Sequence, residues 1–141
     1  MLLHASCIAL GDQAVLLAGP SGVGKSDLAL RLIDQGAELI SDDQTLLTIQ
    51  HSTLCASPPT SLAGLLEVRH MGLMKMPYRA DVPVRLYIDL VASLDGLERL
   101  PEADTILCLD HTVPRLRLPS FASSTPAKIR CFLKYPLATD L

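Results

Sequence analysis

A glycine-rich octapeptide between an apolar run and an amphipathic run constrains this chain more than any other feature. Residues 19–26 are Gly-Pro-Ser-Gly-Val-Gly-Lys-Ser, which fits the pattern Gly-x4-Gly-Lys-Ser. The preceding residues, 14–18, are all apolar and predict a buried strand, whereas 27–35 carry Leu and Ile at helical spacing ahead of Gly36. A strand, a glycine loop and a helix in this order are the context in which the pattern holds phosphate. We therefore expect an α/β fold built around a phosphate-binding loop.

Each residue type in this loop has a physical role toward phosphate. Glycines permit positive φ angles and a close approach of the backbone, so that successive N–H groups turn toward the phosphate oxygens. Lys25 is expected to bridge the β- and γ-phosphates, and the Ser26 hydroxyl is expected to ligate Mg²⁺. The loop itself leaves the identity of the nucleotide open. The predicted nucleotide-binding residues are Gly19, Pro20, Ser21, Gly22, Val23, Gly24, Lys25 and Ser26.

Composition and charge exclude several classes of function. A net charge of −3, without a basic stripe, argues against binding to a nucleic-acid backbone. A chain of 141 residues with 49% hydrophobic content is expected to fold as one domain, 1–141, and its longest uncharged stretch is too interrupted by prolines to span a membrane. The cysteines have no C-x-x-C pairing, so we expect reduced, buried thiols of a cytoplasmic protein and no zinc site. They are Cys7, Cys55, Cys108 and Cys131.

The remaining apolar runs predict a mixed sheet. Residues 2–10 and 14–18 flank a Gly-Asp-Gln turn and predict a hairpin leading into the loop, whose first strand can lie antiparallel. Further strands are predicted at 38–41, 45–50, 84–91 and 105–109. A brief helix is predicted at 62–66, a helix or turn at 94–100, and a C-terminal helix at 127–135, after a Ser-Thr-Pro start signal.

Asp42 and Asp43 directly follow the predicted strand 38–41 and are the leading candidates for chemistry beside the loop. In open α/β sheets, ligands bind at the carboxyl ends of the strands. Adjacent residues leaving a strand point to different sides, so one carboxylate can address Mg²⁺ while the other faces an acceptor hydroxyl. A solvated acidic turn is the alternative interpretation. Asp89 and Asp110, each at the end of an apolar strand, compete as metal-binding candidates.

Three segments, in order and spacing, resemble the catalytic domain of the HPr kinase/phosphorylase family: residues 19–26, Glu-Leu-Ile-Ser-Asp-Asp at 38–43, and Glu-Val-Arg-His-Met-Gly at 67–72. The similarity extends over essentially the whole chain, and its tail resembles compact alphaproteobacterial members that lack the amino-terminal domain of longer relatives. The resemblance implies a fold related to phosphoenolpyruvate carboxykinase. It also implies ATP- and Mg²⁺-dependent transfer of phosphate to a serine hydroxyl of the phosphocarrier HPr, reverse phosphorolysis, and a homo-oligomer such as a hexamer.

The same resemblance assigns roles to residues of the site. Asp42 would take the serine proton as general base and return a proton in the reverse direction. Asp43 and Glu67 would act at the metal together with Ser26. Arg69 would neutralise charge on the transferred group, a role suited to its planar guanidinium. The implied catalytic set is Asp42, Asp43, Arg69 and Lys25, and His4 matches a family histidine near the phosphate.

Several points stay open at the level of sequence. His4 is equally well interpreted as a strand-start histidine with no chemical role, and His70 stands where the family has glycine, so its side chain is expected to alter the loop or crowd the acceptor. Longer relatives carry a basic Pro-Gly-Arg-Asn-like segment that has no match in this sequence. Four basic residues either substitute for it or belong to a solvated helix face: Arg115, Arg117, Lys128 and Arg130. A small-molecule kinase and a non-catalytic nucleotide-binding regulator remain the alternative functions.

Overall fold

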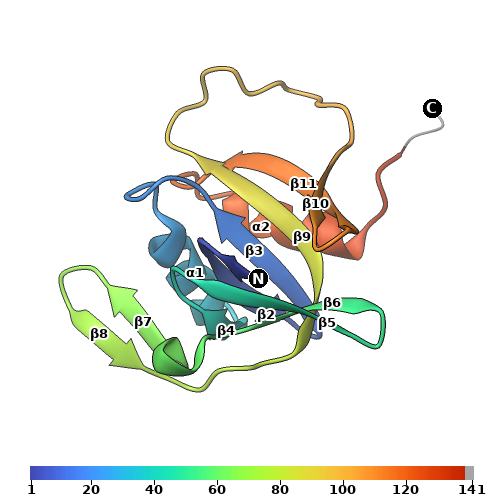
Figure 1. Ribbon diagram of the computed structural model, residues 1–141. Coiled ribbons are helices and arrows are strands. Elements are labelled where there is room, and N and C mark those ends of the chain that lie inside the picture. Colours follow the sequence, from blue (N-terminus) through green and yellow to red (C-terminus); the bar gives the residue numbers. More distant parts are fainter. Residues whose placement is uncertain (139–141) are drawn as a thin grey trace.

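The computed structural model describes residues 1–138 as a large mixed β-sheet with both α-helices packed on one face (Figure 1). The helices are α1 (Lys25–Asp34) and α2 (Thr125–Lys134), and a short 3₁₀ helix spans Thr60–Leu62. The strands are β1 (Leu2–Leu3), β2 (Ala5–Leu10), β3 (Gln13–Ala18), β4 (Glu38–Ser41), β5 (Thr45–Gln50), β6 (Thr53–Ser57), β7 (Leu65–Val68), β8 (Gly72–Lys75), β9 (Val82–Val91), β10 (Asp104–Cys108) and β11 (His111–Pro119). The predicted α/β class with a mixed sheet is confirmed.

The order of the strands brings several of their carboxyl ends to one edge of the sheet. The main path is β1-β5-β6-β9-β3-β2-β4, and β11 also pairs with β9. β3 and β11 both run parallel to β9, whereas β2 is antiparallel to β3 and to β4. Strands β4, β3, β9 and β11 therefore point in the same direction, so the residues that follow them gather at one edge.

Each central strand is buried on both sides, which explains its continuous apolar sequence. Val15 and Leu17 of β3 pack in the cluster that contains helix α1, while Leu16 and Ala18 lie in a second cluster on the opposite face. Alternation of side chains along a strand produces this division. Strands β5 and β6 curl over the second face, as Figure 1 shows, and supply residues such as Leu47. The loops at the edge of the sheet are consequently attached to buried, well-packed strands.

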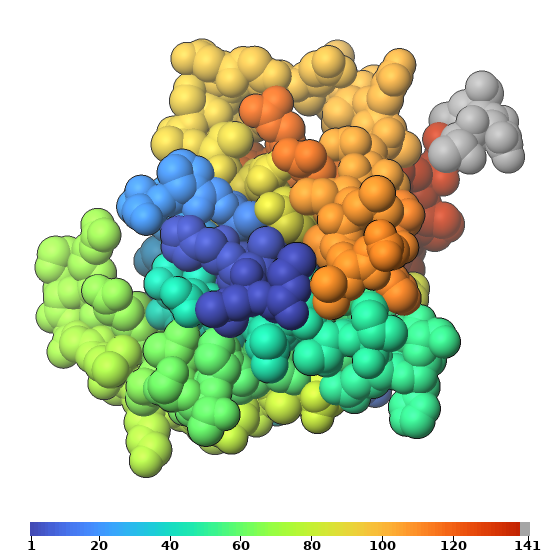
Figure 2. Space-filling model, viewed as in Figure 1, coloured from blue at the N-terminus to red at the C-terminus, as the bar shows by residue number. Residues whose placement is uncertain are grey.

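The hairpin of β7 and β8 stands apart from the main sheet and projects from the body of the molecule (Figures 1 and 2). All four residues of β8, Gly72–Lys75, are exposed, whereas Leu66 of β7 is buried against the core. The hairpin is thus anchored through β7 and presents β8 to solvent.

Most of the predicted elements are confirmed, with differences where prolines and short segments occur. Strands β3, β4 and β5 and helices α1 and α2 lie where the sequence places them, within one or two residues at each end, whereas the strand predicted at 2–10 is divided into β1, which pairs with β5, and β2. The helix predicted at 62–66 is wrong, because a 3₁₀ turn ends at Leu62 and strand β7 begins at Leu65. Strands β6, β8 and β11 were not predicted, and residues 94–100 contain turns without a helix.

Two expectations from composition are tested by the described residues. All four cysteines are unpaired, but Cys131 is exposed, so the prediction that every thiol is buried is wrong for that residue. Cys131 borders an open groove between α2 and Leu116 and Leu118 of β11, where solvent reaches it. No helix in residues 1–138 is long and apolar enough to cross a bilayer.

Candidate active site

A cleft of about 660 Å³ opens at the sheet edge where the parallel strands end. It is bounded by the glycine loop after β3, the turn after β4, the β7–β8 hairpin and the residues that follow β11. The cleft collects most of the predicted site residues, namely Ser21, Gly22, Val23, Gly24, Lys25, Ser26, Asp42, Asp43, Glu67 and Arg69. Gly19 and Pro20 lie behind it at the start of the loop, and His4 reaches it through Asp43.

The loop has the backbone geometry that a phosphate cradle requires. Gly19 has φ +147°, and a Cβ built there would lie 2.9 Å from a Val23 methyl carbon and 3.0 Å from the Leu90 carbonyl oxygen. Any larger residue would therefore force the loop away from β9. The Lys25 ammonium, which is nearly buried, donates to the carbonyls of Gly19 at 2.7 Å and Pro20 at 3.3 Å. Helix α1 begins at Lys25, so its unpaired N–H groups face the cleft.

Asp42 is held in place by donors from three separate segments. Its Oδ1 accepts hydrogen bonds from the hydroxyls of Ser26 at 2.7 Å and Ser6 at 2.9 Å. Its Oδ2 accepts from the backbone N–H of Glu67 at 3.0 Å. Only 8% of the residue is exposed. This carboxylate consequently links the phosphate loop, strand β2 and the β7–β8 hairpin, and it lies directly against the hydroxyl that is predicted to bind Mg²⁺.

Asp43 has the opposite character. Its backbone is left-handed, with φ +68°, and its N–H donates to the Ser6 hydroxyl at 3.1 Å. This turn directs the carboxylate outward, where its Oδ1 lies 2.9 Å from His4 Nε2. The Asp43 and His4 side chains are 64% and 54% exposed. Asp43 therefore presents a carboxylate that is accessible from the open side of the cleft and oriented by a histidine.

The two aspartates thus differ in what they contact, and the division of roles between them stays a prediction. Asp42 was expected to face the acceptor and Asp43 the metal, yet the side chain bonded to Ser26 is that of Asp42. The reason is local: the left-handed residue at 43 turns the second carboxylate away from the loop. Alternation along a strand predicts that the two carboxylates diverge but does not specify which of them faces the loop.

The signature segment 67–72 forms the rim of the cleft. Val68 and Met71 close a tight turn through a 3.0 Å backbone hydrogen bond, and Arg69 and His70 lie between them and line the cleft. His70 has φ +71°, a conformation that glycine adopts without steric cost. The departure from the family pattern therefore occurs at a position where glycine has a backbone advantage, and His70 keeps the turn at some cost in strain.

The competing acidic candidates lie away from the cleft. Asp89 is on the sheet face opposite helix α1, where its Oδ2 accepts from Arg115 Nε at 2.6 Å. Asp110 occupies the turn between β10 and β11, with φ +64°. Neither residue lines the cleft.

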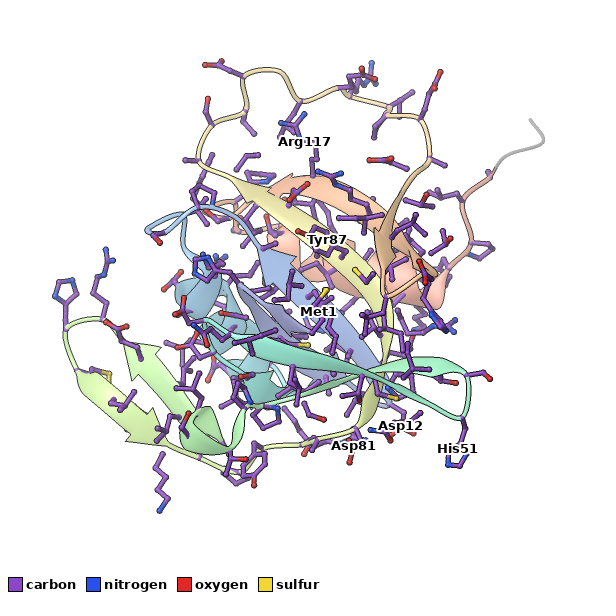
Figure 3. The ribbon with its side chains drawn as sticks, in the orientation of Figure 1. Met1, Asp12, His51, Asp81, Tyr87 and Arg117 are labelled. Atoms are coloured by element: carbon purple, nitrogen blue, oxygen red, sulfur yellow. The ribbon has the colours of Figure 1, made fainter. Side chains whose placement is uncertain are left out.

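The four basic residues that were considered as substitutes for the basic segment of longer relatives also lie outside the cleft in the part of the chain that the structure describes. Arg115 pairs with Asp89, and Arg130 Nη1 donates to Gln35 Oε1 at 2.6 Å. Arg117 lies below the arch of residues 92–103 (Figure 3), and Lys128 borders a separate apolar groove beside α2. None of these cations lines the cleft, so the expectation that they replace the basic segment there is not supported by the geometry.

Several residues of the site had no signal in the sequence analysis. Ser6 is fully buried in β2 and bonds both aspartates. Ser120 follows β11, and its hydroxyl donates to the Val23 carbonyl of the phosphate loop. Phe121 comes next and lines the cleft together with Leu30 of α1. The sequence does place the polar residue Ser6 inside the apolar run of β2. Because a buried hydroxyl needs hydrogen-bond partners, that position indicates a polar contact within the core.

The oxygen atoms around Ser26 suit a hard divalent cation. Within residues 1–138 there is no cluster of three His, Cys, Asp or Glu side chains that would form a complete metal cage. Mg²⁺ does not require one, since it is usually bound by one or two carboxylates together with substrate phosphates and water. The predicted metal ligands Ser26, Asp43 and Glu67, together with Asp42, supply hydroxyl and carboxylate oxygens of that kind on the cleft wall.

Comparison with known proteins agrees with this geometry. The HPr kinase/phosphorylase of Clostridium acetobutylicum is 36% identical over 129 residues, covering 89% of this chain and 42% of the relative. That of Thermoanaerobacter sp. strain X514 is 34% identical over 128 residues, covering 83% of this chain and 42% of the relative. The chain thus spans well under half of the length of these curated relatives.

A solved structure extends the agreement to three dimensions. The structure of the Hpr(Ser) kinase/phosphatase from Coxiella burnetii has a TM-score of 0.83 and 25% identity, and the match covers 95% of this chain and 88% of that chain. The fold is therefore the phosphate-loop fold of phosphoenolpyruvate carboxykinase-like type that the resemblance implies. The family described as HPr Serine kinase C-terminal domain matches residues 1–129, and the chain belongs to that family.

Proposed function

We propose that this chain is the catalytic domain of an ATP- and Mg²⁺-dependent kinase that phosphorylates a serine hydroxyl of an HPr-type phosphocarrier protein. Family membership and the names of the relatives support this assignment. The observation that carries it is the exposed Asp43 carboxylate, oriented by His4 in the cleft that also contains the phosphate loop. The resemblance further leads us to propose a homo-oligomer acting in the cytoplasm.

The nucleotide end of the reaction rests on the loop and on the residues around Ser26. Backbone N–H groups of residues 21–26 and the Lys25 ammonium would hold the phosphates. Ser26, Asp42 and Glu67 would hold Mg²⁺, which would neutralise the negative charge that develops on the transferred phosphate. Asp42 keeps the Ser26 hydroxyl oriented by their 2.7 Å hydrogen bond.

At the acceptor end, Asp43 would accept the proton of the serine hydroxyl while the serine oxygen forms its bond to the γ-phosphorus and ADP departs. His4 holds the Asp43 carboxylate by the contact of 2.9 Å, and Arg69 on the hairpin turn would balance charge on the transferred group. In the reverse direction, an oxygen of inorganic phosphate would bond to the phosphorus of phosphoserine to form pyrophosphate, and Asp43, having taken the proton of the attacking phosphate, would give it to the departing serine oxygen. A positioned base typically contributes about 10² to 10⁴ in rate.

A protein acceptor fits the described residues better than a small molecule does. Small-molecule kinases usually close an arginine-rich lid over their substrate, and Arg79 and Arg85 are the candidates for that role in this chain. Arg79 instead pairs with Asp12 at 2.8 Å, near the end of the sheet away from the loop, and neither arginine lines the cleft. The cleft is bordered by the projecting hairpin, so a protein loop can approach it.

Mass spectrometry tests the proposal most simply. The chain, Mg²⁺, ATP and purified HPr from the same organism are incubated, and the phosphorylated residue of HPr is located. We expect phosphoserine that requires both ATP and Mg²⁺, and Asp110→Asn, which alters a carboxylate outside the cleft, should give the same product at the same rate. Phosphate on histidine, or none after prolonged incubation, would contradict the proposal.

A further inference from the structure

The phosphate loop follows β3, and the residues that flank the loop follow strands on either side of β3 in the sheet. The relevant strand order is β4-β2-β3-β9-β11, with the loop after β3 in the centre. Asp42 and Asp43 follow β4 on one flank, and Ser120 and Phe121 follow β11 on the other. Both flanks contact the loop itself: Asp42 bonds the Ser26 hydroxyl at 2.7 Å, and a Cβ built at Gly24 would lie 3.2 Å from the Ser120 hydroxyl oxygen. The loop therefore separates a carboxylate flank from the flank that carries Phe121.

The turn that carries Phe121 is fixed on both sides. The guanidinium of Arg31, from helix α1, donates to the carbonyl of Ser120 and to that of Ala122 at 3.3 Å. The Ser120 hydroxyl donates to the Val23 carbonyl in the phosphate loop. Phe121 between these anchors is nevertheless 59% exposed. An aromatic ring is therefore presented to solvent by a turn that is tied directly to the phosphate loop.

The chemistry of the loop gives the nucleotide a direction. Its backbone cradles the α- and β-phosphates, while its lysine reaches the β- and γ-phosphates and its serine the metal. Because Ser26 is bonded to Asp42, the terminal phosphate belongs on the β4 flank. The nucleoside must then extend toward the β11 flank, where Phe121 and Leu30 line the same cleft.

We infer that Phe121, backed by Leu30, is the subsite on which the base of the nucleotide stacks. The inference rests on the proposed function, since it assumes a nucleoside triphosphate donor. Cofactor sites are commonly lined by apolar and aromatic side chains with few polar groups, which describes this end of the cleft. Stacking of a base on an aromatic side chain corresponds to about a 5- to 150-fold gain in affinity.

Binding measurements that compare ATP with inorganic tripolyphosphate, both with Mg²⁺, isolate the base. Phe121→Ala should weaken ATP binding by about 5- to 150-fold and leave tripolyphosphate binding unchanged. Tyr135→Ala is the matched control, because Tyr135 is 57% exposed but lies beside α2 outside the cleft. Lys25→Ala should weaken both ligands, since Lys25 acts at the phosphate loop and not on the base.

A fluorescence experiment gives an independent readout. The chain contains no tryptophan, so Phe121→Trp introduces a single reporter at the inferred subsite. ATP should change its emission and tripolyphosphate should not, with ATP affinity kept close to that of the unaltered chain.

The outcomes separate this inference from the proposed function. Equal ATP affinity in the unaltered chain and Phe121→Ala overturns the base subsite, while the proposed function stands if Lys25→Ala still loses both ligands. If Lys25→Ala binds both ligands normally, the proposed function fails and the inference with it. If Phe121→Ala instead raises KM for HPr at unchanged ATP affinity, the ring belongs to the acceptor site and the inference is wrong.

Discussion

Replacing Asp42 by asparagine perturbs the most densely bonded side chain of the site. Its two oxygens accept three hydrogen bonds, from Ser6, Ser26 and the Glu67 N–H. Asparagine has one acceptor oxygen, so either the two hydroxyls must turn away or the amide NH₂ must face the Glu67 N–H. The residue is 8% exposed, so water does not readily compensate. Leaving one buried donor unpaired costs about 1–3 kcal/mol, which is the expected loss in the free energy of unfolding.

Urea denaturation followed by circular dichroism measures that loss, and the Mg²⁺ dependence of transfer measures the functional effect. Asp42→Asn should be destabilised and should need more Mg²⁺, because Ser26 loses its orienting partner. Asp43→Asn is the matched control: its side chain is 64% exposed, so its stability should change by less than about 0.5 kcal/mol. Equal stability of Asp42→Asn and the unaltered chain, with an unchanged Mg²⁺ requirement, would refute this reasoning.

Two further predictions concern histidines. His70→Gly should raise the transfer rate at little cost in stability, because glycine accepts φ +71° and removes a side chain from the rim; identical rates at every pH would place residue 70 outside the site. His111 has Nε2 2.9 Å from the Ser52 carbonyl and Nδ1 3.1 Å from that of Leu109, and these acceptors raise its pKa above the ordinary 6.5. Its stabilising effect should therefore be complete below pH 6.5 and lost as pH rises through the folded-state pKa. NMR titration and the pH dependence of stability in His111→Ala test this, and an unshifted titration would contradict it.

The parts of the fold that follow from local pattern could be predicted, and those that depend on pairing could not. The Gly-Asp-Gln turn between two apolar runs was sufficient to indicate the β2–β3 hairpin, and Gly36 marked the end of α1, where it has φ +109°. Strand β11 contains Pro114 and Pro119, which argue against a strand in sequence alone. It forms because its residues 115–119 pair with β9 and its residues 111–115 pair with β10.

The site shows the same division. The glycine loop, Asp42, Asp43 and the hairpin residue Glu67 could be predicted from motif and strand end, and all of them line one cleft. Their mutual contacts could not, because the bonds of Ser6 to both aspartates depend on the register of β2 against β4. Which aspartate faces the loop depends on a single backbone angle at residue 43.

Single-turnover transfer to HPr by Asp43→Asn, at saturating Mg²⁺ and ATP, tests the central claim most directly. Asp43 is exposed and bonded to His4 rather than to Ser26, so ATP binding and folding should be preserved. The rate of phosphoserine formation should fall by about 10² to 10⁴ relative to the unaltered chain. Transfer at an undiminished rate with ATP bound normally would contradict the assignment of Asp43 as the base, and with it the account of this cleft as the place where serine is phosphorylated.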